Sequence, residues 1–357
     1  MNKKKDNIII LLLFTALVIF SIFTIVSFAG QAKNVGHISI LDFVLIYIVL
    51  IVEFLLAVLF HELGHLIAGL ISGYEFLYYR IGSYALVNYG DGFRIKRQYA
   101  PGTGGQCLLV PPKLVNGDFP WLFYNLGGIL MNIILAIVCF VLLLQAKGPM
   151  EIAIYKLNIG INLYFALGNG INIQGTDGGN IVEMKNSKSA RENFWDVLNY
   201  EAMSIRDTAG LDDYNFLTDD NEGVIGQYKQ IIEIDKNVFD GNYEEVLALS
   251  DEFLNREDAH MLYKGEVAFN RAYARTILEK KENLLDELYA DKRMKNYYKG
   301  TMNNPSRSRF NIMYYSIIKP DKVKLHESLE KFEKDIAREL NLHYAGLERN
   351  EIKKYIS

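Results

Sequence analysis

The feature that most constrains this 357-residue chain is the uneven placement of its apolar residues, which gather before about residue 180. A helix needs roughly 20 apolar residues to cross the hydrocarbon core of a bilayer. The runs 8–29, 40–71 and 121–144 meet that length, and a weaker run covers 152–167. We therefore expect an α-helical integral membrane protein with about four transmembrane helices.

The N-terminal apolar run has two interpretations. Three lysines precede it, as in a secretory signal peptide. The run is longer than the apolar region of a typical signal, and no small-residue cleavage site precedes Gln31. We expect a retained helix, which with a short loop makes up a first segment, 1–38.

The distribution of lysine and arginine predicts the orientation in the membrane. The N-terminus carries three such residues and the loop 74–120 carries five, whereas the other two short loops carry one each. Positively charged loops stay on the cytoplasmic side. The sequence therefore predicts a multi-pass protein of the cell membrane with both chain ends in the cytoplasm.

The remainder, 181–357, is charged and has the apolar spacing of helices at 243–254, 261–278 and 323–340. Helices with short connections resemble tetratricopeptide hairpins, although we find no clean repeat signature, and an ordinary solvated helical domain fits equally well. We expect a cytoplasmic α-helical domain that offers a surface for a protein partner.

Charge and cysteine content exclude some classes of protein. The formal net charge is −4 and there is no large basic patch, so we expect no binding to nucleic acid. Cys107 and Cys139 are the only cysteines, and Cys139 lies inside an apolar run. These observations argue against a disulfide framework and against a cysteine zinc site.

The segment His61-Glu-Leu-Gly-His65 carries the clearest chemical signal. Residues four apart lie on one face of a helix, so His61 and His65 can bind one zinc ion while Glu62 accepts a proton from its water. The pattern also occurs by chance. Inside an apolar run, however, each ionisable group costs on the order of 3 kcal/mol to insert, which favours a compensating metal.

A catalytic zinc site needs a third protein ligand, for which Asp177 is the best candidate. The helix from 41 and the helix from 152 run toward the same side, and each reaches its motif near the cytoplasmic end. An ordinary Asp-Gly turn is the alternative for Asp177. Glu53 lies two helical turns before His61, where it either lines a water path or faces another helix as a structural polar residue; we prefer the second interpretation.

These motifs resemble those of the site-2 protease family of intramembrane zinc metalloproteases. The resemblance covers about 42–180. The family's first motif, H-E-x-x-H, is matched at 61–65, and its second, N-x-x-P-x-x-x-x-D-G, is matched in spacing at 169–178. Asn172 stands where the family has proline.

The resemblance implies a role for each matched residue. His61, His65 and Asp177 would be the metal ligands and Glu62 the catalytic residue. Asn169 would help to position the substrate.

Two weaker resemblances concern substrate binding. The segment 128–132 is similar to the family's G-P-x-x-N segment, again without proline, so Asn132 would contact the substrate backbone; an interhelical hydrogen bond is the alternative. Gly104 and Gly105 match the paired glycines of the family's β-rich loop. They would permit close approach of a substrate strand that pairs with 106–110, although a simple cytoplasmic hairpin is the alternative.

Together, the sequence predicts a zinc endopeptidase of bacterial type with one Zn²⁺ per chain. Its membrane core would span 39–180, with the β-rich loop 74–120, and 181–357 would form the helical domain. The substrate would be a transmembrane protein or peptide, such as a membrane-bound regulator, a signal-peptide remnant or a peptide precursor.

Two alternatives remain: a catalytically inactive scaffold that recruits partners, and a transporter-like protein, for which inverted repeats are missing. The ligand types also admit another divalent metal.

Overall fold

The computed structural model describes residues 3–35, 39–98, 104–211, 213–280 and 304–356, with the single positions 290, 292 and 295. The chain divides into two compact units. The first comprises Met1–Ile81 and Gly104–Ser187, and the second comprises Gly82–Thr103 and Lys188–Ser357. Pro101, which belongs to the predicted β-rich loop 74–120, lies outside the described residues.

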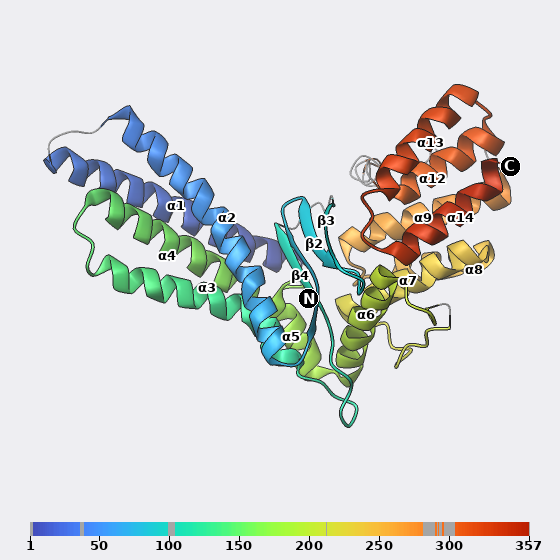
Figure 1. Cartoon of the computed structure of the whole chain (residues 1–357), viewed down its shortest axis with the longest axis horizontal. Coiled ribbons are helices and arrows are strands. Elements are labelled where there is room, and N and C mark those ends of the chain that lie inside the picture. Colours follow the sequence, from blue (N-terminus) through green and yellow to red (C-terminus); the bar gives the residue numbers. More distant parts are fainter. Residues whose placement is uncertain are drawn as a thin grey trace. The chain divides into compact units, whose positions relative to one another are not determined.

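Four helices form the body of the first unit: α1 (Lys3–Val35), α2 (Ile40–Ile71), α3 (Trp121–Leu143) and α4 (Pro149–Gly170). Figure 1 shows them side by side. Among the described residues, α1, α2 and α3 are long and apolar enough to cross a membrane. Only 11% of the most apolar window of α1 and of α2 is buried within the protein, so their apolar surfaces face outward. The prediction of a helical membrane protein is confirmed at this level, and α4 as a fourth span stays a prediction.

Helices α2 and α3 pack closely because glycines stand where they meet. A Cβ atom added to Gly64 of α2 would collide with the backbone carbonyl of Gly127 in α3. A Cβ atom added to Gly127 would likewise collide with the backbone carbonyl of Gly64. Where α1, α2 and α4 meet, the larger side chains of Phe28, Ile46 and Leu157 are buried. The glycine contact brings the backbone of α3 close to the helical turn that carries the H-E-x-x-H motif.

The first unit also contains two strands and a short helix. Strand β1 (Glu75–Ile81) pairs antiparallel with β4 (Gly105–Val110), with a register shift between Phe76 and Tyr78. Leu77 and Leu109 are fully buried, as expected for strands with one covered face. Helix α5 (Asp177–Asn186) begins after Thr176, whose hydroxyl accepts a hydrogen bond from the backbone N–H of Gly179.

The second unit begins with a hairpin of β2 (Tyr84–Asn88) and β3 (Phe93–Arg97), paired from Tyr84↔Arg97 to Asn88↔Phe93. Asp91 and Gly92 lie in the turn between these strands, where Gly90 and Gly92 both have positive φ. The strand-like character of this part of the sequence is therefore confirmed. The amine of Lys96 donates hydrogen bonds to the carbonyls of Ala337 and Glu339, which ties the hairpin to the helices of the same unit.

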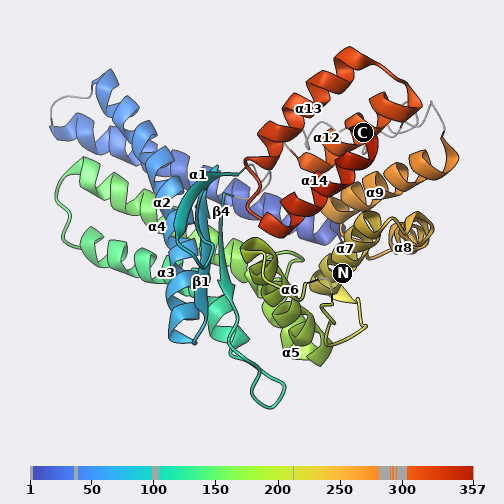
Figure 2. The ribbon, with the colours of Figure 1, turned by 45° about the vertical axis from the view of Figure 1, so that its right-hand side comes forward.

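Most of the other described residues of the second unit are helical (Figure 2). Its core gathers Phe253, Tyr273 and Phe310, all fully buried. The helix expected after Asn242 begins at Tyr243, as predicted. The helices are α6 (Lys188–Arg206), α7 (Gly223–Asp240), α8 (Tyr243–Asn255), α9 (Met261–Glu279), α12 (Pro305–Met313), the π-helix η1 (Tyr314–Ile318), α13 (Lys322–Ile336) and α14 (Leu342–Ile356).

Candidate metal centre

The three predicted ligands lie together in the first unit. His61 and His65 occupy one face of α2, are buried, and have their Nε2 atoms 3.2 Å apart. Asp177 is the first residue of α5, and its Oδ2 atom lies 3.2 Å from Nε2 of His61 and 3.3 Å from Nε2 of His65. Among the described residues, this is the one group of histidine, cysteine and acidic side chains close enough to hold a metal ion.

The loop before α5 is folded tightly against the end of α4, which fixes Asp177. The Thr176 hydroxyl donates toward the carbonyls of Ile171 and Ile173, both at 2.8 Å. A Cβ atom at Gly178 would collide with the carbonyl of Gly170, so the backbone can approach this closely only at glycine. The Asp-Gly pair therefore allows the turn that delivers the carboxylate.

The other ring nitrogen of each histidine has a partner on α3. Nδ1 of His65 lies 2.8 Å from the backbone carbonyl of Tyr124, and Nδ1 of His61 lies 2.7 Å from Oδ1 of Asn132. A carbonyl oxygen only accepts hydrogen bonds, so Nδ1 donates in both cases. Both Nε2 atoms consequently keep a lone pair that points toward Asp177, which is the arrangement that metal-ligating histidines show.

Three acceptor atoms therefore face one another in a buried place. No described residue donates a hydrogen bond to Oδ2 of Asp177. These three atoms repel one another unless a cation, either a shared proton or a metal ion, lies between them. Burial raises the pKa of the Asp177 carboxyl, but a proton shared with His65 or His61 outweighs it and lowers the pKa to about 2. The carboxylate is therefore ionised at neutral pH.

The spacing also fits a metal ion. Ligand bonds of about 2.0–2.1 Å around tetrahedral zinc place two ligand atoms about 3.3–3.4 Å apart. The observed separations of 3.2 and 3.3 Å are close to this value. The donor set of two imidazoles and one carboxylate is one that zinc accepts, with a fourth position left for water.

Gly128 on α3 keeps space free next to these atoms. A Cβ atom at this position would lie 2.5 Å from Nε2 of His65 and 2.6 Å from Nε2 of His61. Any larger residue would therefore push against the two ligand atoms. Gly128 lies within helix α3, so no turn requires a glycine at this position; its small size leaves room for the ligand atoms.

Glu62 lies between the metal centre and strand β4. A Cβ atom at Gly105 would lie 2.7 Å from Cγ and 3.0 Å from Oε1 of Glu62, so the side chain packs against the strand backbone. Among the described residues, β4 pairs with β1 on one edge and has no strand on the other. Arg80 of β1, which is fully buried, donates a hydrogen bond to the carbonyl of Gly105. The strand thus has a defined position beside the glutamate.

The residues predicted to bind the substrate lie around the metal centre and along α4. Asn132 is fully buried, and its amide donates to the carbonyl of Ala57 at 3.1 Å and to Oδ1 of Asn162 at 2.8 Å. Asn169 lies near the end of α4 and donates to the carbonyl of Phe165. Gly104 is exposed and immediately precedes β4. Substrate contacts by Asn132, Asn169 and the glycines stay predictions.

Three residues contribute to the site in ways that the sequence did not predict. Tyr124 acts through its backbone carbonyl, which no sequence pattern marks. The proximity of Gly128 to the ligands depends on how α2 and α3 pack. Asn162 carried a usable signal, because Asn158 and Asn162 are four residues apart in an apolar helix, where polar groups are rare.

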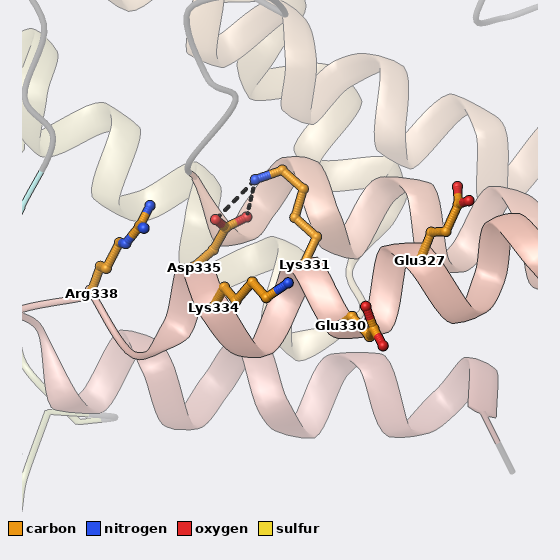
Figure 3. Close-up of a pocket in the computed structure, with 6 residues that line it drawn as sticks. All are labelled: Glu327, Glu330, Lys331, Lys334, Asp335 and Arg338. Atoms are coloured by element: carbon orange, nitrogen blue, oxygen red, sulfur yellow. Dashed lines mark hydrogen bonds and ion pairs between the residues drawn. The ribbon is translucent and has the colours of Figure 1, made fainter.

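A pocket of about 310 Å³ lies in the second unit on α13 (Figure 3). It is lined by charged side chains alone: Glu327, Glu330, Lys331, Lys334, Asp335 and Arg338. Lys331 and Asp335 form an ion pair at 3.0 Å within it. Its acidic side chains do not belong to the one group of described residues that lies close enough together to hold a metal ion.

Comparison with known proteins adds no identification: no family model, curated protein or solved structure matches this chain.

Proposed function

We propose that this chain is an intramembrane zinc endopeptidase of the site-2 protease type, which hydrolyses a peptide bond in or near a transmembrane segment of its substrate. The observation that carries the proposal is the convergence of His61, His65 and Asp177, with both Nε2 lone pairs and an ionised carboxylate directed at one point. The family assignment itself comes from the sequence motifs.

The three side chains would hold the zinc ion. When bound, zinc supplies a water molecule that is acidic enough to lose a proton near pH 7 and polarises the scissile carbonyl. Glu62 lies next to the ligands in α2 and accepts that proton, which it then donates to the leaving amine. The packing of Glu62 against Gly105 supports this role, since it holds the carboxylate between the ligands and the strand.

The free edge of β4 supports a mode of substrate binding. A transmembrane helix hides its carbonyls in internal hydrogen bonds, so it must unwind before a peptide bond is attacked. An unwound segment pairs with an exposed strand edge through its main chain. β4 offers such an edge from Gly105 to Val110, directly beside Glu62.

The finer topology belongs to the same proposal. α4 serves as a fourth span, both chain ends lie in the cytoplasm, and the protein resides in a bacterial-type cell membrane. The helices of the second unit, arranged in hairpins of tetratricopeptide kind, recruit a protein partner. The charge distribution of the sequence supports this orientation.

The test uses full-length protein in lipid vesicles with a model transmembrane peptide that carries a helix-breaking segment and a tag at each end. We expect the wild type to release both tags and Glu62→Gln to retain zinc without cleaving. Zinc binding without cleavage of any of several such peptides by the wild type would favour the inactive scaffold instead.

A further inference from the structure

A series of hydrogen-bonded side chains extends from the metal ligand His61 into the helix bundle. His61 donates to Asn132 on α3, and Asn132 donates to Oδ1 of Asn162 on α4 at 2.8 Å. Asn162 in turn donates to Oδ1 of Asn158 at 3.0 Å, one helical turn earlier in α4. Asn158 donates to the carboxylate of Glu53 on α2. The series, Glu53–Asn158–Asn162–Asn132–His61, therefore leaves α2 and returns to it two turns away.

This placement is costly for an apolar bundle. Asn132 is 0% exposed and Asn162 is 1% exposed, and both lie among helices whose outer surfaces are apolar. A buried amide without partners costs about 1–3 kcal/mol, so such groups persist where their hydrogen bonds are satisfied. Here the hydrogens and the oxygen of each of the two amides have partners, which makes the series complete.

Every donor in the series points the same way, toward Glu53. An amide can be turned so that its oxygen and nitrogen exchange places, and only its neighbours determine which way it faces. The carboxylate of Glu53 accepts hydrogen bonds, so it requires the NH₂ group of Asn158 to face it. The Asn158 oxygen is then left for Asn162, and the Asn162 oxygen for Asn132.

Backbone carbonyls fix the same direction at two further points. Asn132 donates its other hydrogen to the carbonyl of Ala57, and Asn162 also donates to the carbonyl of Asn158. With its NH₂ group committed in this way, Asn132 can present only its oxygen to His61. His61 must then carry its proton on Nδ1, and Nε2 is the nitrogen left to bind a metal.

We propose that Asn162, Asn158 and Glu53 are positioning residues for the metal ligand His61: they hold Asn132 in the one orientation that keeps Nε2 of His61 unprotonated and directed at the metal. The inference rests on the proposed metal site and assigns the residues behind one of its ligands. None of the three contacts the reacting atoms. Their effect reaches the site through Asn132 alone.

A purely structural role is the competing explanation, because polar side chains also join membrane helices. The two roles differ in what a substitution changes. Loss of a residue that orients a ligand histidine lowers metal affinity by about 10–100-fold. Loss of an interhelical contact lowers the stability of the bundle and leaves the affinity of the folded protein unchanged.

The experiment compares zinc affinity and thermal stability in full-length, detergent-purified variants. Asn162→Leu removes the partner of Asn132. Ile161→Ala is the matched control, because Ile161 is the neighbouring residue of α4, is equally buried, and takes no part in the series. We expect zinc affinity to fall about 10-fold in Asn162→Leu and to stay at the wild-type value in Ile161→Ala, although the control loses stability.

A second pair of variants covers the case in which Asn162→Leu does not fold. Glu53 is only partly buried and lies at the far end of the series. Glu53→Gln retains an oxygen that accepts from Asn158, whereas Glu53→Leu does not. We expect a several-fold loss of zinc affinity in Glu53→Leu and wild-type affinity in Glu53→Gln. Equal zinc affinities in Glu53→Leu and Glu53→Gln would overturn the proposal, whether or not Asn162→Leu folds.

A readout on zinc-free protein separates this inference from the proposed function. Side-chain ¹⁵N NMR of histidine-labelled protein at pH 8 distinguishes protonated from unprotonated ring nitrogens, and His61→Ala identifies the signals. We expect a single Nδ1–H tautomer for His61 in wild type and Ile161→Ala, and a mixture in Asn162→Leu. A wild type that binds no zinc would end the metalloprotease proposal, while the tautomers would still decide the role of the series. Identical tautomers in all variants would contradict it.

Discussion

Oδ2 of Asp177 lies 3.2 Å from Nε2 of His61, and both atoms are hydrogen-bond acceptors in a buried place. The two residues come from different helices, one within α2 and one at the start of α5. Their approach depends on the glycine contact between α2 and α3 and on the tight loop at the end of α4. Most of the tests below change one component of this arrangement while leaving the others in place.

Asp177→Asn tests the carboxylate as a ligand, because it removes the charge and keeps the size. We expect zinc affinity to fall by more than about 100-fold, since removing a ligand costs more than removing a residue behind one. The measurement is competition with a zinc chelator. Glu75→Gln, which removes an exposed carboxylate of β1, is the control and should bind zinc like the wild type. Equal zinc affinity in Asp177→Asn and Glu75→Gln would exclude Asp177 as a ligand.

Gly128→Ala tests the space beside the ligands. The added Cβ atom would lie 2.5 Å from Nε2 of His65, so we expect at least a 10-fold loss of zinc affinity. Gly168→Ala in α4 is the matched control, since an added Cβ atom meets nothing within 4 Å there. The two variants exchange the same atoms within helices. If both bound zinc equally well, Gly128 would have no role in the metal centre.

Gly105→Ala tests the contact between Glu62 and strand β4. Its Cβ atom would lie 2.7 Å from Cγ of Glu62 and would displace the carboxylate, which does not hold the metal. We expect full zinc content and a cleavage rate at least 10-fold lower, as for a misplaced general base. At Gly104 the nearest atom would lie 3.4 Å away, an ordinary contact, so Gly104→Ala should be affected much less. Similar cleavage rates in both variants would argue against the proposed position of Glu62.

Glu348 predicts a pH dependence of stability in the second unit. Burial raises the pKa of its carboxyl from 4.5 to about 7, although Arg309 lies 3.1 Å away and favours the charged form. The folded protein therefore binds this proton more tightly than the unfolded chain. The stabilisation is fully present below about pH 4.5 and is lost as the pH rises through 7, by on the order of 3 kcal/mol.

The measurement is urea unfolding at pH 5 and pH 8, followed by tryptophan fluorescence. All variants carry Trp121→Phe, so that the signal comes from Trp195 in α6 and follows the unfolding of the second unit alone. We expect the free energy of unfolding to be lower at pH 8, and this difference to shrink in Glu348→Gln, which cannot ionise. A pH dependence that is the same with and without the substitution would show that Glu348 is not responsible.

The fold was predictable from sequence as far as local patterns determine it. The apolar runs predicted α1, α2 and α3, and the β-rich loop predicted at 74–120 contains the hairpin of β2 and β3. For the site, the four-residue spacing of His61 and His65 placed both on one face of α2. Asp177 was expected near them because both helices reach their motifs near the cytoplasmic end, and its carboxylate does lie beside the two histidines.

The features of the site that could not be predicted from the sequence depend on contacts between helices. Gly128 approaches the ligands only because Gly64 and Gly127 let α2 and α3 touch. The partner of His65 is a backbone carbonyl, that of Tyr124, and every residue has one. No property of a single helix predicts these relationships, because each depends on how two helices pack.

The most direct test of the central claim is the zinc content of purified full-length protein, compared with that of the His61→Ala/His65→Ala double variant. The metal centre described above predicts about one zinc per chain in the wild type and none in the double variant. A folded wild type that takes up no zinc when zinc is supplied would contradict it. So would a double variant that retains the wild-type amount.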